Sequence, residues 1–129
     1  MLVRSITPAD FDTVHHLLVS NGWAHRVGDV EDLGRLISAS QRALVAVADD
    51  QIVGFARAIT DGISNGYLSM VVVAESHRTR GIGRALVERL VGSEPSITWV
   101  LRAGREGAAE FFAKLGFSAS TTAMERPRC

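Results

Sequence analysis

One stretch limits the possible folds more than any other, "YLSMVVVAESHRTRGIGRALVERL", residues 67–90. Its first eight residues include the continuous apolar run "MVVVA", which is typical of a strand buried on both faces. A turn with Gly81 and Gly83 follows, and the next residues place an apolar stripe at helical spacing until Gly92. A strand covered on both faces needs a layer of structure on each side, so the segment predicts a layered fold of sheet and helices.

The rest of the chain supplies those layers. Thr7 and Pro8 mark the start of a helix that Asn21 and Gly22 end, and Asp29 is a candidate cap for a second helix. We predict strands over residues 2–6, 42–48, 51–60, 67–74, 96–103 and 117–125, and helices over 8–20, 30–39, 81–92 and 106–115. This order predicts an α+β fold (an α/β sandwich) with a mostly antiparallel central sheet, in one domain spanning residues 1–129.

Composition excludes several classes of function. Fourteen basic and fourteen acidic residues give zero formal charge, so no overall basic field favours nucleic acid or a membrane surface. No stretch is apolar over the 18 or so residues that a membrane span needs, and the N-terminus does not resemble a signal peptide. The single Cys129 and the scattered histidines provide no metal site. These features predict a cytoplasmic protein without a metal.

The glycine turn has two interpretations. A helix that begins at a glycine offers free backbone amides and a partial positive charge, which together bind anions. The three arginines of the turn, Arg78, Arg80 and Arg84, would add charge. The alternative is a plain helix start with solvated arginines. The turn fits neither the P-loop pattern nor the dinucleotide pattern, because no Lys-Ser/Thr pair follows and Leu86 stands where a third glycine belongs.

Two motifs together resemble a known family. Arg78-x-x-Gly81-x-Gly83 is similar to the acetyl-CoA-binding motif R/Q-x-x-G-x-G/A of the GNAT acyltransferases. The later segment "AAEFFAKLGF" looks like the second signature of that family, and the order of elements over residues 2–125 also matches. The resemblance implies a GNAT-like fold that uses acetyl-CoA as cosubstrate.

The resemblance also implies where acetyl-CoA would bind. The pantetheine arm would pair with the exposed backbone of the buried strand, and the pyrophosphate would lie on the amides of the glycine turn. The implied contact residues are Val71, Val72, Val73, Arg78, Thr79, Arg80, Gly81, Ile82, Gly83, Arg84, Arg105 and Phe112.

The implied chemistry is attack of an amine on a thioester, which requires loss of a proton from an ammonium with a pKa of about 10. The backbone amide of Val71 is the candidate donor to the developing oxyanion. The family often has a Tyr acid where this chain has Phe112, and an Asn where it has Arg105. Tyr67 stands where a glutamate is common; it either supplies a proton or orders a water, or it only packs at the sheet edge.

Candidate acceptor-binding residues lie elsewhere in the chain. Trp23 and Arg26 fall between the first two helices, a region that lines the acceptor site in GNAT proteins. They either hold an aromatic or acidic amine, or Trp23 packs on the core. Arg57 lies in an apolar strand and faces either the acceptor cleft or solvent.

The leading hypothesis is therefore an N-acetyltransferase that acts on an amine, favoured as a small molecule. The alternative is an acyl-CoA-binding sensor or regulator without efficient turnover, motivated by Phe112 and the lack of a carboxylate base. A structural module that binds no ligand is a third reading. The family resemblance also makes a homodimer plausible.

Overall fold

The computed structural model describes residues 1–129, and its centre is one five-stranded sheet. The strands lie in the order of the chain, and all neighbours are antiparallel except the last pair, β4 and β5, which is parallel. The strands are β1 (Leu2–Ser5), β2 (Arg42–Ala48), β3 (Gln51–Thr60), β4 (Asn65–Val73) and β5 (Thr98–Val100). The α+β class and the mostly antiparallel sheet are confirmed.

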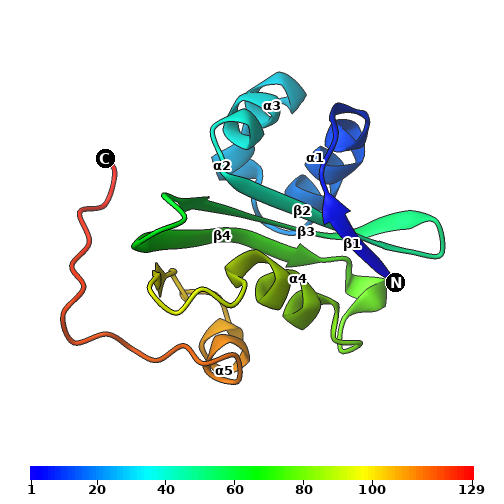
Figure 1. Ribbon diagram of the computed structural model, residues 1–129. Helices are drawn as coiled ribbons and strands as arrows, with labels where there is room; N and C mark the ends of the chain where they lie inside the picture. The colour runs from blue at the N-terminus through cyan, green and yellow to red at the C-terminus, as the bar shows by residue number, and fades with distance from the viewer.

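Helices cover both faces of the sheet (Figure 1). One face carries α1 (Phe11–Ser20), α2 (Ala24–Val27) and α3 (Val30–Ser38), and the other carries α4 (Ile82–Val91) and α5 (Ala108–Ala113). Two short 3-10 turns, η1 (Pro8–Asp10) and η2 (Glu75–His77), precede α1 and α4. The sequence did not predict α2, which lies in the segment between the two expected helices. None of these helices has the length and apolar character needed to cross a bilayer.

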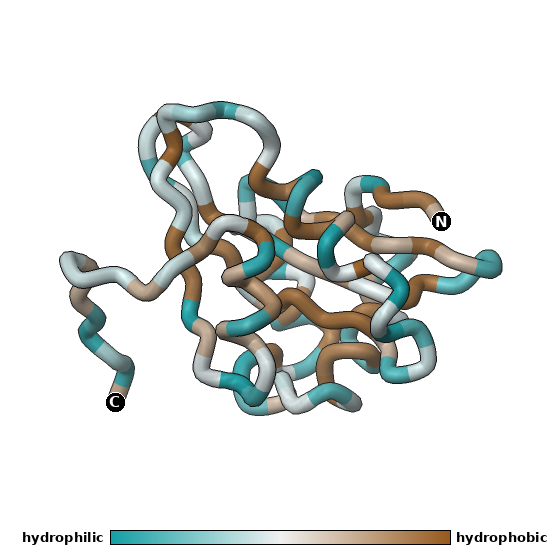
Figure 2. Tube along the Cα trace, turned by 90° about the horizontal axis from the view of Figure 1, so that it is seen from below, coloured by the Kyte–Doolittle hydropathy of each residue, from teal (hydrophilic) through white to brown (hydrophobic).

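Each face of the sheet has its own apolar core. The face under α1 and α3 buries Phe55, which is fully inaccessible, together with Val45 and Val72. The face under α4 buries Leu68 of the sheet against Leu86 and Leu90 of the helix. Figure 2 shows these hydrophobic stretches running through the middle of the molecule, with hydrophilic segments at the outer turns. The long apolar run of β4 is thus explained by burial on both faces, as predicted.

The hairpin between β2 and β3 turns at the two residues that lie between the predicted strands 42–48 and 51–60. Asp49 and Asp50 both have positive φ, 52° and 60°, which matches the twist of two antiparallel strands joined by a two-residue turn. The cap of α3 is confirmed as well, because the Asp29 carboxylate accepts a hydrogen bond from the Asp32 amide at 2.8 Å.

The strand predicted over residues 117–125 is wrong. Phe117 packs edge-on against Phe112, with ring centroids 5.7 Å apart, but the chain beyond it forms no strand. The Ser120 hydroxyl accepts hydrogen bonds from the amides of Thr122 and Ala123, which is a turn that competes with strand pairing. The small polar side chains also offer no apolar face to bury, and Figures 1 and 2 show the tail standing apart from the sheet.

The start of α1 holds a buried carboxylate that supports the fold. Asp10 accepts hydrogen bonds from both terminal nitrogens of Arg4, at 2.8 and 3.0 Å, and from the Thr7 amide at 2.8 Å. The hydrogen bonds from Arg4, helped by those from Thr7 and opposed by burial, lower the pKa of Asp10 from 3.8 to about 2. A carboxyl group with a lowered folded-state pKa stabilises the protein at pH values above its unfolded pKa.

We therefore expect Asp10→Asn to lower the free energy of unfolding at pH 7 by about 1–2 kcal/mol, allowing for solvent screening of the more exposed Arg4. The difference should shrink as the pH falls from about 4 and be small near pH 2, where about half of the native carboxyl groups are protonated. Urea unfolding of both proteins at pH 7, 4 and 2 measures it. A difference that stays constant over this range would contradict the assigned role of the carboxylate.

Candidate active site

The site begins where two neighbouring strands separate. β4 pairs with β5 only from Asn65 to Tyr67, so the edge of β4 from Leu68 to Val73 has no strand beside it. A cleft of about 1610 Å³ lies along this open edge, between the α1–α2 connection on one side and α4 and α5 on the other. The smaller hollow between α1 and α3, near Phe11 and Gly34, lies apart from it.

A β-bulge in β4 sets the direction of the backbone in the cleft. Phe55 pairs with Val72 and Arg57 pairs with Ser69, so Met70 and Val71 together oppose the single residue between them on β3. Met70 accordingly has a φ of 57°. The extra residue shifts the alternation of side chains between the two faces of β4 by one position. As a result, Leu68 packs in the core on one face and Met70 in the core on the other.

The glycine turn forms a row of free amides at the far end of this edge. The six backbone amides from Thr79 to Arg84 donate to no protein group. Ala85 is the next residue, and its amide donates to the Gly81 carbonyl at 3.0 Å. Thr79 and Gly81 have positive φ, 64° and 79°, and a Cβ at Gly81 would meet nothing within 4 Å. Successive free amides at the start of a ten-residue helix make an anion site.

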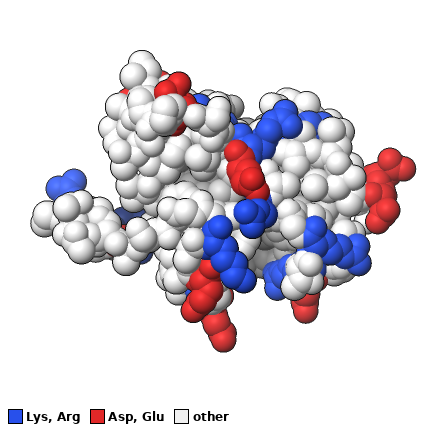
Figure 3. Space-filling view, turned by 60° about the horizontal axis from the view of Figure 1, so that its bottom comes forward, with Lys and Arg blue, Asp and Glu red and all other residues white.

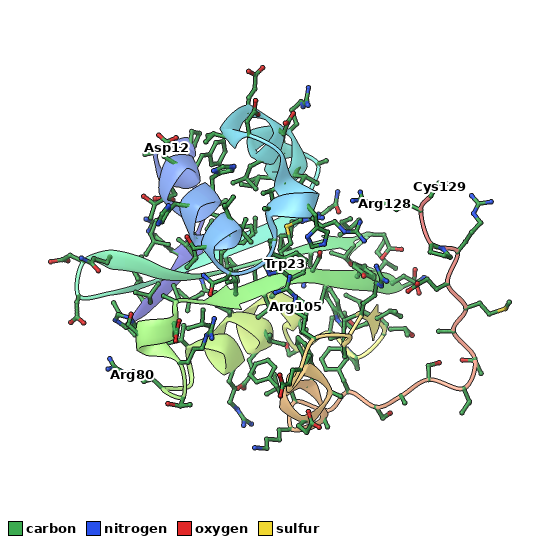
Figure 4. All side chains as sticks on the ribbon, turned by 180° about the vertical axis from the view of Figure 1, so that it is seen from behind. Asp12, Trp23, Arg80, Arg105, Arg128 and Cys129 are labelled. Atoms are coloured by element: carbon green, nitrogen blue, oxygen red, sulfur yellow. The ribbon has the colours of Figure 1, made fainter.

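The arginines of this turn are engaged elsewhere. Arg78 donates to the Val73 carbonyl at 3.1 Å and to the Asn21 side chain at 2.6 Å, and Arg84 pairs with Glu88 at 2.7 Å. Arg80 points away from the cleft at the outer rim of the turn (Figure 4). The cleft wall thus includes Arg78 and Arg84 but not Arg80, and the free donors of the glycine turn on this wall are backbone amides rather than guanidinium groups.

Gly83 has a packing role that the sequence did not show. A Cβ at this position would lie 3.1 Å from the Phe111 ring and 3.6 Å from Val73, rather than in open space. Gly83 therefore lets α4 approach α5 closely, and only Gly81 faces open space. Phe111 is half-buried and lines the cleft beside the buried Phe112.

An arginine joins the two sides of the cleft. Arg105, from the connection between β5 and α5, donates to the carbonyl groups of Asn21 and Gly22 at 2.9 and 3.0 Å. Its guanidinium carbon lies 4.0 Å from the centre of the Trp23 ring, and Figure 4 shows the two side chains close together. Trp23 therefore stacks on a cation across the cleft, an arrangement that joins the predicted cofactor and acceptor residues.

The remaining predicted residues line the other half of the cleft. Because paired residues of neighbouring strands share a face, Arg57, Ser69 and Tyr67 all lie on the face that carries α1 and α2. Arg26 of α2 lines the same half. Arg57 is 8% exposed, and burial lowers its pKa, with the neighbouring Tyr67 opposing the shift.

Sequence reasoning missed several contributors to this cleft, among them Ser69, Asn21 and the C-terminal tail. Ser69 follows Tyr67 by two residues, so strand alternation could have found it. Asn21 and the tail could not be found in this way, since their positions depend on long-range contacts. The tail reaches the cleft through two contacts, Arg102 with Glu125 at 2.9 Å and Arg128 with the His25 carbonyl at 3.2 Å.

Most of the charged side chains that line the cleft are positive. Nine cationic side chains line it, whereas Glu106 and Glu125 are its only two acidic ones, although the whole chain has equal numbers of both. Figure 3 shows Lys and Arg side chains on both sides of a hollow on the face that carries α4 and α5, with a few acidic side chains among them. A cleft lined in this way favours anionic ligands.

Comparison with known proteins agrees with this geometry. Residues 39–119 match the family model of the acetyltransferase (GNAT) domain. No curated protein matches the chain. A sheet that opens beside a glycine turn at a helix start defines the class as an acyl-CoA-dependent transferase fold, and the chain belongs to the GNAT acetyltransferase family, whose members transfer an acyl group from acetyl-CoA.

Solved structures share the fold over nearly the whole chain. A protein of the GNAT family from Xanthomonas campestris has a TM-score of 0.81 at 24% identity, covering 99% of this chain and 94% of its own. A GNAT-family acetyltransferase from Streptococcus pneumoniae has a TM-score of 0.78 at 24% identity, covering 98% and 96%. A ribosomal-protein-alanine N-acetyltransferase from Brucella melitensis has a TM-score of 0.76 at 20% identity, covering 98% of each chain.

Proposed function

We propose that this protein is an N-acetyltransferase that transfers the acetyl group of acetyl-CoA to the amine of a small molecule. The observation that supports it is the continuity of the open β4 edge with six free amides at the start of α4. An extended chain with amide groups can pair with the strand edge, and its diphosphate can then lie on the amides. The residues present therefore fit acetyl-CoA.

The backbone performs most of the binding in this proposal. The amides of Thr79 to Arg84 hold the diphosphate, and the strand from Val71 to Val73 holds the pantetheine arm. The Val73 carbonyl faces the open edge, where it accepts a hydrogen bond from the Arg78 side chain, and strand geometry turns the backbone groups of alternate residues in the same direction. The Val71 amide, two residues earlier at the bulge, is then the donor to the oxygen of the reacting carbonyl.

The amine must lose a proton before it attacks. Its nitrogen then forms a bond to the acetyl carbon and loses its second proton, the carbon–sulfur bond breaks, and CoA leaves as a thiolate that takes up a proton. A cleft with nine cations and two acids destabilises a bound ammonium group and so lowers the pKa of the acceptor amine. The positive charge of the cleft therefore assists deprotonation where no carboxylate base stands beside Tyr67.

Tyr67 is the candidate proton donor, since Phe112 has no hydroxyl group. If Tyr67 protonates the leaving thiolate or orders the water that does so, Tyr67→Phe should lower kcat by about 10–100-fold and change the pH profile of the rate. Acetyl-CoA binding should stay as in the wild type, because the ring is kept. Steady-state kinetics over a pH series measures both effects. A wild-type rate and profile would assign Tyr67 to packing alone.

The experiment that tests the proposed function combines binding with turnover. Acetyl-CoA, CoA and desulfo-CoA should each raise the melting temperature, because they bind only the folded chain. CoA release with a broad panel of amines should then identify acceptors, including peptides with an N-terminal alanine, the acceptor type named for the Brucella relative. No thermal shift with any of the three would refute the proposal.

One observation favours a second function. Phe112 occupies the position of the usual acid, so a protein that binds acyl-CoA and senses it without efficient turnover is the alternative. A thermal shift with no CoA release over the whole panel would select this alternative. The homodimer and the cytoplasmic location stay predictions.

A further inference from the structure

Arg57 is a buried cation without a counter-ion. Its side chain donates from Nη1 to the Ser40 hydroxyl at 3.2 Å and from Nε to the Met70 sulfur at 3.4 Å, and both acceptors are neutral. No carboxylate of the chain pairs with it, and its Nη2 donates to no protein acceptor. Burying an unpaired charge destabilises a fold, so a residue kept in this state points to a ligand.

The position of Arg57 places this charge beside the proposed point of transfer. Arg57 pairs with Ser69, and the residue before it on β3, Ala56, lies opposite the Met70–Val71 bulge. Arg57 and Val71 also line the same cleft. A small molecule bound there can therefore reach both the guanidinium and the Val71 amide.

The surrounding charges exclude a purely cationic acceptor. Arg26, Arg126 and Arg128 line the same cleft as Arg57, and Glu125, one of the two acids of the cleft, is paired with Arg102. An amine without a negative group would enter as an ammonium ion against this field. An amine with a carboxylate brings the single negative charge that one guanidinium can neutralise.

We propose that the acceptor is an amino-acid-like molecule whose carboxylate pairs with the Arg57 guanidinium while its amine faces the open edge of β4. This assignment rests on the proposed acetyl transfer and names the substrate class for it. Arg57 is then the residue that selects acceptors with a carboxylate over the corresponding amines without one.

The test compares wild type, Arg57→Met and Arg57→Lys in the presence of CoA, which occupies the cofactor groove without reacting. The ligands are amino acids, their decarboxylated amines, and amines with a phosphate or sulfonate in place of the carboxylate, measured by calorimetric titration. We expect the wild type to prefer the amino acid by about 30-fold, Arg57→Met to lose that preference, and Arg57→Lys to keep part of it. Binding of the decarboxylated amines should change less than about 3-fold.

Stability gives a second readout that a structural role would not reproduce. Removing an unpaired buried charge should leave the melting temperature of ligand-free Arg57→Met unchanged or higher. The matched control is Arg42→Met, because Arg42 lies outside the cleft. This variant should have a lower melting temperature, since Arg42 donates to the Leu90 carbonyl at 2.7 Å and stacks over Trp99.

Three results would overturn the assignment: equal binding of the amino acids and the decarboxylated amines, a stronger preference for the phosphate or sulfonate, or no binding by any member of the panel. A loss of stability in Arg57→Met equal to that in Arg42→Met would overturn it too. Failure of the proposed function is read separately, from the thermal shift with acetyl-CoA and from CoA release, since the titration needs no turnover.

Discussion

Gly81→Val is expected to weaken acetyl-CoA binding by about 100-fold or more. Gly81 has a φ of 79°, which costs a residue with a Cβ about 1–2 kcal/mol, and a β-branched side chain more. The chain relieves that strain by rotating the amides on either side of residue 81, which lie in the middle of the free row from Thr79 to Arg84. Losing two or more charge-assisted hydrogen bonds to a diphosphate accounts for the expected factor. Calorimetric titration with acetyl-CoA measures it.

The turn between β3 and β4 provides a matched control. Gly62 has a φ of 74°, and a Cβ there would also meet nothing within 4 Å, yet it lies outside the cleft. Gly62→Val should thus lower the melting temperature about as much as Gly81→Val and leave acetyl-CoA affinity at the wild-type value. Equal affinities for the two variants would show that the amides of the α4 turn do not hold the diphosphate.

Phe55→Ala is expected to lower the free energy of unfolding by about 3–5 kcal/mol. Phe55 is fully buried at the centre of the core beneath α1 and α3, and it pairs with Val72 next to the bulge. Truncation removes the apolar contacts of a large ring and leaves a cavity that the rigid sheet cannot close. Because a small domain has a total stability of 5–15 kcal/mol, this one change removes a large part of it. Denaturant unfolding followed by circular dichroism measures the loss.

Ile59→Ala on the same strand is the control for Phe55→Ala. Its side chain is 47% exposed, so its loss should cost less than about 1 kcal/mol. A loss comparable to that of Phe55→Ala would mean that the core does not lie where the structure places it.

Local chemistry made several elements predictable. The helix after the glycine turn, the Asp29 cap of α3 and the Asp49-Asp50 hairpin depend on neighbouring residues, because backbone conformation and capping act over a few positions. Residues 117–125 have a local pattern that predicted a strand, but they have no neighbouring strand to pair with and form none. A local pattern was therefore not sufficient for this element.

In the candidate site, too, some features follow from local sequence and others from tertiary contacts. The glycine turn is one continuous segment, so the sequence alone was sufficient to propose its amides as an anion site and to indicate the family. Only the tertiary structure decided which guanidinium groups are available. Arg78 and Arg105 are bound to the α1–α2 connection, more than fifty residues away in sequence, whereas Arg57 is buried with no carboxylate beside it. A sequence lists charges, but their partners depend on contacts between distant segments, and an unpaired charge is recognised only when those contacts are known.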